Sequence, residues 1–190
     1  DQKLIYVYDD FNFEQPLIMG RLYVNVIRGG ESYAFEYDDE WLRKTSMSVN
    51  LDPELMLFGG RQYPLAKNIF GLFADASPDR WGRVLMNKRE RLLAEKEKRK
   101  PKKLYDSDYL LGVYDETRMG GLRFKTALNG TFLSDDKDSA VPPWANLRTL
   151  EEASRNFESD DNGLAEKWLN QLIRPGSSLG GARPKATVVD

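Results

Sequence analysis

The sequence predicts a mixed α+β protein, in which an N-terminal antiparallel β meander or small barrel with a helix precedes a second, α/β subdomain. Three patterns support this fold class. Residues 4–37 alternate apolar with polar side chains and are rich in β-branched and aromatic residues. Residues 77–100 carry apolar side chains at helical spacing. Residues 106–172 then combine a short strand with helical segments.

The first three strands are bounded by turn signals. The alternation occupies residues 4–8, 16–26 and 32–37. Arg28-Gly29-Gly30-Glu31 separates the last two runs and predicts a hairpin turn. Next along the chain, Trp41-Leu42 predicts a short helical turn, and residues 46–51 predict a further strand that Asp52-Pro53 ends. An antiparallel meander is therefore expected over the first fifty residues.

Ser77-Pro78-Asp79 predicts the start of a long helix, because it offers a cap, a proline at the first helical position and an early carboxylate. The apolar face of this helix is expected to comprise Trp81, Val84, Leu85, Leu92 and Leu93. Residues 101–103, beginning with a proline, end the helix. They divide the chain into an N-terminal subdomain, 1–103, and a second portion, 104–190.

The second portion contains several short elements. Residues 106–113 predict a short helix or turn, and helices are expected over 147–157 and 162–172. Arg118-Met119-Gly120-Gly121 precedes a strand over 122–126. These glycines are interpreted either as a structural turn or as a functional bend, since glycine before a strand often serves geometry alone.

A glycine-rich segment near the C-terminus is the candidate functional motif. Ser177 and Ser178 supply hydroxyls, and the adjacent Gly180 and Gly181 let the backbone approach an anion closely. Arg183 and Lys185 add positive charge. The segment fails the Walker A pattern, and residues 186–189 predict a strand, as after the phosphate-covering loop of protein kinases. A hairpin turn with solvated basic residues is the alternative.

Composition narrows the class of protein. The chain has 190 residues, of which 41% are hydrophobic and 31% charged, so it can bury a core in one or two domains. It contains no cysteine and no histidine, which excludes disulfides, thiolate metal sites and histidine-based hydrolase triads. No apolar run reaches membrane-spanning length, and no signal peptide is visible. We expect a cytoplasmic protein without membrane contact.

Positive charge is concentrated in residues 88–103, which hold nine Lys/Arg and three Glu, although the whole chain has a net charge of −2. Such a run is typical of a solvated helix face, and it is also compatible with contact to nucleic acid or an acidic partner. Direct binding of nucleic acid is the weaker hypothesis, because no aromatic residues accompany the charges for base stacking.

Four separate blocks resemble, in order, those of HipA-family proteins. They are Ala74-Asp75-Ala76-Ser77-Pro78-Asp79-Arg80-Trp81-Gly82-Arg83, Asp106-Ser107-Asp108-Tyr109-Leu110-Leu111-Gly112-Val113, Arg118-Met119-Gly120-Gly121-Leu122-Arg123-Phe124 and Ser178-Leu179-Gly180-Gly181-Ala182-Arg183-Pro184-Lys185-Ala186. The resemblance covers nearly the whole chain. It implies the N-terminal portion of a serine/threonine-protein kinase toxin, with residues 104–190 as a kinase N-lobe portion that ends in the glycine-rich loop.

The resemblance also implies the chemistry and the partners. ATP and Mg²⁺ are the expected cofactors, and the substrate is a protein, in this family an aminoacyl-tRNA synthetase. A helix-turn-helix antitoxin is the expected inhibitor, through which the kinase meets DNA indirectly. Ser178, Gly180, Gly181, Ala182, Arg183 and Lys185 are implied to line the nucleotide. Ser178, with Ser177 as its neighbour and competitor, is implied as the regulatory autophosphorylation site.

No catalytic or metal-binding residue is expected within residues 1–190. The phosphate-binding lysine and the catalytic Asp and Asn residues are expected after Asp190. The chain begins without methionine and ends within a predicted strand, so a fragment of a longer polypeptide is expected. The alternative is a non-catalytic docking module that binds a separate kinase or antitoxin, although such a module has no evident use for the glycine-rich loop.

Overall fold

The computed structural model describes residues 2–45, 50–65, 68–113, 115, 118–133, 148, 155, 181 and 183. Most of the strand predicted over 46–51 lies outside these residues, and the described Asn50 and Leu51 are not in a strand. The helices predicted over 147–157 and 162–172, apart from two single residues, and the strand predicted over 186–189 also lie outside.

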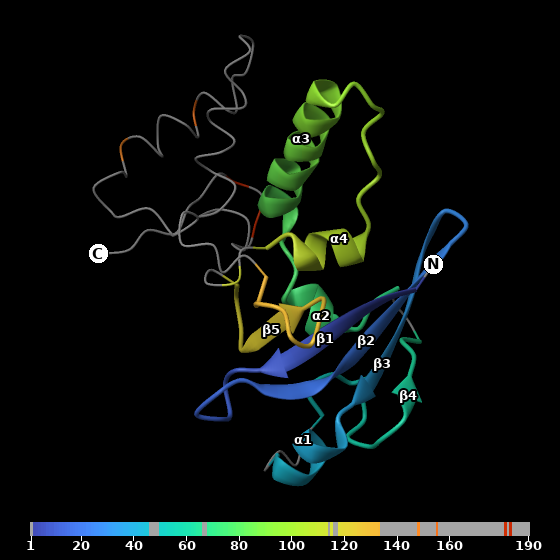
Figure 1. Ribbon diagram of the computed structural model, residues 1–190, viewed down its shortest axis with the longest axis vertical. Helices are drawn as coiled ribbons and strands as arrows, with labels where there is room; N and C mark the ends of the chain where they lie inside the picture. The colour runs from blue at the N-terminus through green and yellow to red at the C-terminus, as the bar shows by residue number, and fades with distance from the viewer. Residues whose placement is uncertain are drawn as a thin grey trace.

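The described part of the chain is built on an antiparallel sheet of five strands in the order β4-β3-β2-β1-β5 (Figure 1). The strands are β1 (Gln2–Asp9), β2 (Leu17–Ile27), β3 (Gly30–Tyr37), β4 (Arg61–Gln62) and β5 (Leu122–Lys125). The meander β1-β2-β3 is as predicted, with the tight turn at Arg28 and Gly29. β5 comes from the second portion of the chain and pairs with β1, where Val7 lies opposite Phe124.

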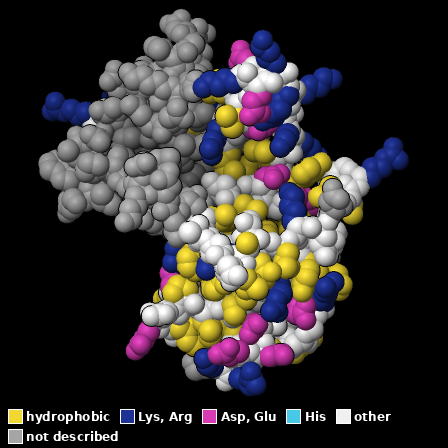
Figure 2. Space-filling view, viewed as in Figure 1, with side chains coloured by type: hydrophobic (Ala, Val, Ile, Leu, Met, Phe, Trp, Pro, Cys, Tyr) yellow, Lys and Arg dark blue, Asp and Glu magenta, His cyan; other side chains and the backbone are white. Residues whose placement is uncertain are grey.

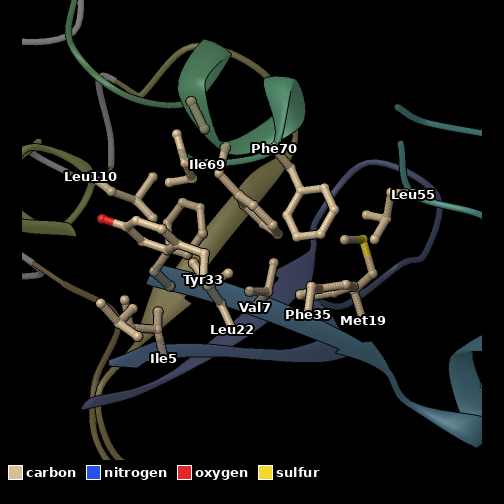
Figure 3. Packing of buried hydrophobic residues seen from close by; sticks show 14 of the residues in the cluster. Ile5, Val7, Met19, Leu22, Tyr33, Phe35, Leu55, Ile69, Phe70 and Leu110 are labelled. Atoms are coloured by element: carbon tan, nitrogen blue, oxygen red, sulfur yellow. The ribbon is translucent and has the colours of Figure 1, made fainter. Parts of the chain in front are cut away.

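Alternation in the strands gives the sheet one densely covered face. Fully buried side chains come from every second position, such as Ile5 and Val7 in β1 and Leu22 and Val24 in β2. Phe70 is the residue immediately before α2 (Gly71–Asp75), and its side chain points toward Val7 and Phe35 in the sheet (Figure 3). Phe35 and Phe73 are in tilted ring contact at 5.2 Å. The core therefore lies between the sheet and α2.

A buried carboxylate fixes the chain where β1 ends. Asp9 accepts hydrogen bonds from the backbone N–H groups of Phe11 and Asn12, at 3.0 and 3.2 Å, and from the Trp41 ring N–H at 3.0 Å. Trp41 belongs to α1 (Asp39–Lys44), the helix predicted at this position, and its ring stacks on Tyr37 at 5.1 Å. Asp9 thus joins the β1–β2 loop to α1.

The long helix α3 (Arg80–Lys96) begins two residues later than predicted. Asp79 is its cap, so Pro78 precedes the cap and is not the first helical residue. Ser77 donates instead to the carbonyl of Phe73 at 2.8 Å, closing the end of α2. The buried face also differs from the prediction, because Val84 and Leu93 are exposed. The buried residues of α3 are Trp81, Gly82, Leu85, Met86 and Ala94.

The predicted α+β class is confirmed at the level of one antiparallel sheet with helices. The described helices are α1, α2, α3 and α4 (Asp106–Leu111), the last of which was predicted as a short helix or turn. The subdomain boundary at residue 103 stays a prediction. In the part of the chain that the structure describes, no helix has the length and apolar character needed to cross a membrane.

Gly20 in β2 provides a test of the packing between β2 and β3. A Cβ at this position would lie 2.3 Å from the Glu36 carbonyl oxygen and 2.5 Å from Cζ of Phe35. We expect Gly20→Ala to lower the free energy of unfolding by about 1–3 kcal/mol, measured by denaturant titration. Gly30→Ala is the control, since an added Cβ meets no atom within 4 Å there. Equal stability of the two variants would contradict this packing.

Candidate functional site

The start of α3 holds one residue of the predicted glycine-rich loop. Asp79 accepts from the backbone N–H of Arg80 at 2.7 Å, and its second carboxylate oxygen accepts from the N–H of Gly181 at 2.5 Å. The Gly181 carbonyl in turn accepts from the N–H of Trp81 at 2.9 Å. The first N–H groups of a helix have no acceptor within the helix. The Gly181 carbonyl supplies such an acceptor to the N–H of Trp81.

The backbone of Gly181 explains why glycine stands there. Its φ is 90°, in the left-handed region that a side chain disfavours. Its N–H, which the resemblance assigns to a phosphate, is donated to the Asp79 carboxylate in this structure. Arg183 is described and exposed. Ser177, Ser178, Gly180, Ala182 and Lys185 lie outside the described residues, so their predicted roles stay predictions.

A buried arginine joins the middle of the chain to the helices. Arg118 donates from one nitrogen to the carbonyls of Ala76 and Leu110, at 2.8 and 2.9 Å, and from another to the carbonyl of Val113 at 3.3 Å. These carbonyls lie at the ends of α2 and α4. The last carbonyls of a helix lack partners within it, and a cation is favourable there. Arg118 therefore caps the C-terminal ends of both α2 and α4.

Arg118 is balanced by a buried carboxylate. Asp115 lies 3.7 Å from Nε of Arg118 and accepts from Nε of Arg123 at 2.5 Å. The Arg118 guanidinium also lies 4.5 Å from the ring centre of Phe124. Burial lowers the pKa of Arg118 to about 10, although the charge of Asp115 raises it, so the group stays protonated at neutral pH. Asp115 therefore links the Arg118 guanidinium to Arg123 in β5.

A second arginine links α3 to α4. Both terminal nitrogens of Arg83 lie 3.1 Å from one carboxylate oxygen of Asp106, and its Nε donates to the Pro78 carbonyl at 3.1 Å. The guanidinium lies 4.4 Å from the ring centre of Tyr109. Arg83 is half-buried, so this ion pair is partly shielded from water and positions α4 beside α3.

These contacts connect all four sequence blocks. Asp79 of the first block contacts Gly181 of the fourth, and Arg83 of the first contacts Asp106 of the second. Arg118 of the third contacts carbonyls of the first and second. Segments that are up to about one hundred residues apart are thus brought together by side chains within the blocks themselves. The blocks mark a packed junction around the ends of α2, α3 and α4.

No family model, curated protein or solved structure matches this chain. Any functional assignment therefore depends on the residues and contacts described above.

The basic run is partly neutralised within the chain. Arg99 forms ion pairs with Glu90 and Glu97. Hydrogen bonds from Arg99 and from the backbone N–H of Lys102 lower the pKa of Glu90 to about 2, so this carboxylate is ionised throughout the neutral range. Lys and Arg side chains gather over α3 on the face shown in Figure 2. Contact of the remaining basic residues with a partner stays a prediction.

Sequence reasoning missed a buried carboxylate in β3. Both oxygens of Glu31 accept hydrogen bonds: one from the Ser107 hydroxyl at 2.7 Å, the other from the Ser107 N–H at 3.2 Å and from the Tyr33 hydroxyl. Burial raises the pKa of Glu31, but these hydrogen bonds and the charge of Lys3 outweigh it and lower the pKa below its ordinary value. A signal was present, since Glu31 shares the alternation phase of Tyr33, Phe35 and Tyr37.

Removal of the Arg118 charge tests the junction. We expect Arg118→Met to destabilise the fold by about 3–5 kcal/mol, because it leaves Asp115 with a weaker balance and three carbonyls without donors. Arg21→Met is the control: Arg21 and Asp38 form a half-exposed pair at 3.6 Å, and its loss is expected to cost less than about 1 kcal/mol. Similar denaturation midpoints for the two variants would refute the role of Arg118.

The attachment of Gly181 can be tested at its acceptor. Asp79→Ala is expected to lower stability by about 1 kcal/mol through loss of the helix cap and to accelerate hydrogen exchange at the Gly181 amide. Asp75→Ala, which removes an exposed carboxylate at the end of α2, serves as the control and should change neither quantity. An unchanged exchange rate at Gly181 in the Asp79 variant would rule out the contact.

Proposed function

We propose that this chain is the N-terminal part of a HipA-like toxin kinase, which phosphorylates a protein on Ser or Thr with ATP. The observation that carries the proposal is the contact of Gly181 with Asp79 and Trp81. Residues that resemble the family in two blocks one hundred positions apart meet there. Chance similarity of short motifs gives no reason for such a meeting, whereas a shared architecture does.

The donor groups of the loop suit a phosphate. Gly181 offers a backbone N–H, and Arg183 is an exposed guanidinium two residues later. Backbone N–H groups of glycine loops and guanidinium groups are the usual phosphate ligands in proteins. Asp79 now accepts the Gly181 N–H, so a phosphate that uses this donor must displace a carboxylate. ATP, with Mg²⁺, would supply the phosphoryl group to be transferred, and the catalytic Asp and Asn residues are expected outside this chain.

The remaining parts of the proposal come from the resemblance alone. The protein substrate is an aminoacyl-tRNA synthetase, the inhibitor is a helix-turn-helix antitoxin, and the location is the cytoplasm. Ser178, or Ser177 beside it, is the autophosphorylation site. A phosphate at either serine adds negative charge to a loop that binds phosphate, so it should lower the affinity for ATP.

ATP binding tests the proposal directly. In a polypeptide that extends past Asp190 and includes the expected lysine strand and Asp/Asn motifs, we expect calorimetry to detect ATP binding. Gly181→Asp should abolish it, because a side chain is disfavoured at a φ of 90° and the added carboxylate repels phosphate.

Gly60→Asp is the matched control for that experiment. It also has a positive φ, 98°, and an added Cβ meets no atom within 4 Å, so ATP affinity should be retained. Equal ATP affinity in the Gly181 variant would overturn the loop assignment. A wild-type polypeptide that binds no ATP would overturn the kinase proposal in favour of the docking module.

A further inference from the structure

A concave pocket of about 420 Å³ lies between the β2–β3 turn and the segment that leads into α4. Its walls come from Ile27 to Gly30 in the turn and from Lys103 to Asp106 before α4, with Arg83 and Tyr109 beside them. Small-molecule sites usually have volumes of about 300–1,000 Å³. None of the described residues that line this pocket belongs to the predicted glycine-rich loop.

The floor of the pocket carries no free charge. Glu31 lies there, but its carboxylate is saturated by Ser107 and Tyr33, and Lys3 offsets its charge at 3.3 Å. The side chain of Glu31 is only 2% exposed. A cation entering the pocket would therefore find no available carboxylate at the floor.

One wall is also neutral. Arg83 pairs with Asp106 at 3.1 Å, and its guanidinium carbon lies over the Tyr109 ring, 4.4 Å from the ring centre. Leu104 and Tyr105 add an aliphatic and an aromatic side chain to this wall. Such surface is suited to a ring on the ligand.

Two cations remain at the rim. Arg28 lies in the β2–β3 turn and Lys103 in the segment before α4, and neither has a carboxylate within 4 Å among the described residues. The Lys103 ammonium lies 3.5 Å from the Gly29 carbonyl oxygen and 5.1 Å from the ring centre of Tyr105. Two like charges held at one rim without a counter-ion attract a ligand with two negative charges.

We propose that this pocket binds a small phosphate monoester that carries a planar ring, with its phosphate between Arg28 and Lys103 and its ring against Tyr105 and Arg83. A phosphate monoester is close to doubly charged at neutral pH and matches the two cations. Guanidinium and ammonium groups are both common phosphate ligands. The site is independent of the proposed kinase function.

Phenyl phosphate is the probe, added to the full chain with calorimetry and amide NMR as readouts. We expect saturable binding, with shifts of the Gly29, Gly30 and Tyr105 amides, and a lower affinity at higher salt. Phenol should not bind, and benzoate should bind more weakly than phenyl phosphate. Arg28→Ala and Lys103→Ala should each weaken binding by about tenfold. Both side chains are exposed, so neither change should disturb folding, which circular dichroism can verify.

Two control variants separate this site from other basic surfaces. Lys102→Ala removes an exposed neighbouring cation that does not line the pocket and keeps the backbone N–H that Glu90 accepts, so affinity should be unchanged. Gly181→Asp should also leave affinity unchanged. Absence of saturable binding, benzoate as tight as phenyl phosphate, or a wild-type affinity in the Arg28/Lys103 double variant would overturn the proposal. Loss of binding in the Gly181 variant would assign the phosphate to the loop instead and would equally overturn it.

Discussion

The attachment of the helices to the sheet depends on the buried Arg118 guanidinium. The helices α2 and α4 are short, so they leave most of their terminal carbonyls without partners. Arg118 donates to three of these carbonyls from one fixed plane, which water could not do in a site that is almost fully buried. An ammonium group on a flexible stem lacks this planar array of donors. Arginine is therefore the residue that the geometry of this junction requires.

The balance of that charge ties the junction to the sheet. Asp115 offsets Arg118 and is in turn contacted by Arg123 of β5. β5 pairs with β1, so the charges that close the two helices are connected to the same sheet that Phe70 covers. A shift of β5 would leave one of these buried charges without its partner. An unpaired charge in a protein interior is strongly destabilising. The sheet and the helices are therefore coupled through electrostatics as well as through apolar packing.

Local patterns in the sequence predicted the local structure well. Alternation and a glycine turn were enough to predict β1 to β3, and Ser77-Pro78-Asp79 before an apolar face was enough to predict α3 within a few residues. The role of Arg118 could not be predicted, because the carbonyls to which it donates lie 5 to 42 residues away and its own surroundings indicate only a turn. The Gly181 contact was missed for the same reason. Long-range polar contacts do not alter the spacing of apolar residues, so the sequence pattern does not reveal them. Glu31 is an exception, because it occupies a position in β3 where the alternation predicts a buried apolar residue.

Three of the residues that carry the resemblance cap or connect helices in the described part of the chain. Asp79 caps α3, Arg83 attaches α4 to α3, and Arg118 caps the ends of α2 and α4. The presence of these residues therefore constrains the fold more directly than it constrains any reaction that the protein performs. Gly181 differs from these residues. Its N–H can donate a full hydrogen bond either to the Asp79 carboxylate or to a bound anion, but not to both. Like charges repel, so a phosphate beside Gly181 and the Asp79 carboxylate disfavour one another. Any anion that binds this donor must therefore loosen the loop from α3, and occupancy of the loop is coupled to its attachment to the N-terminal part of the chain.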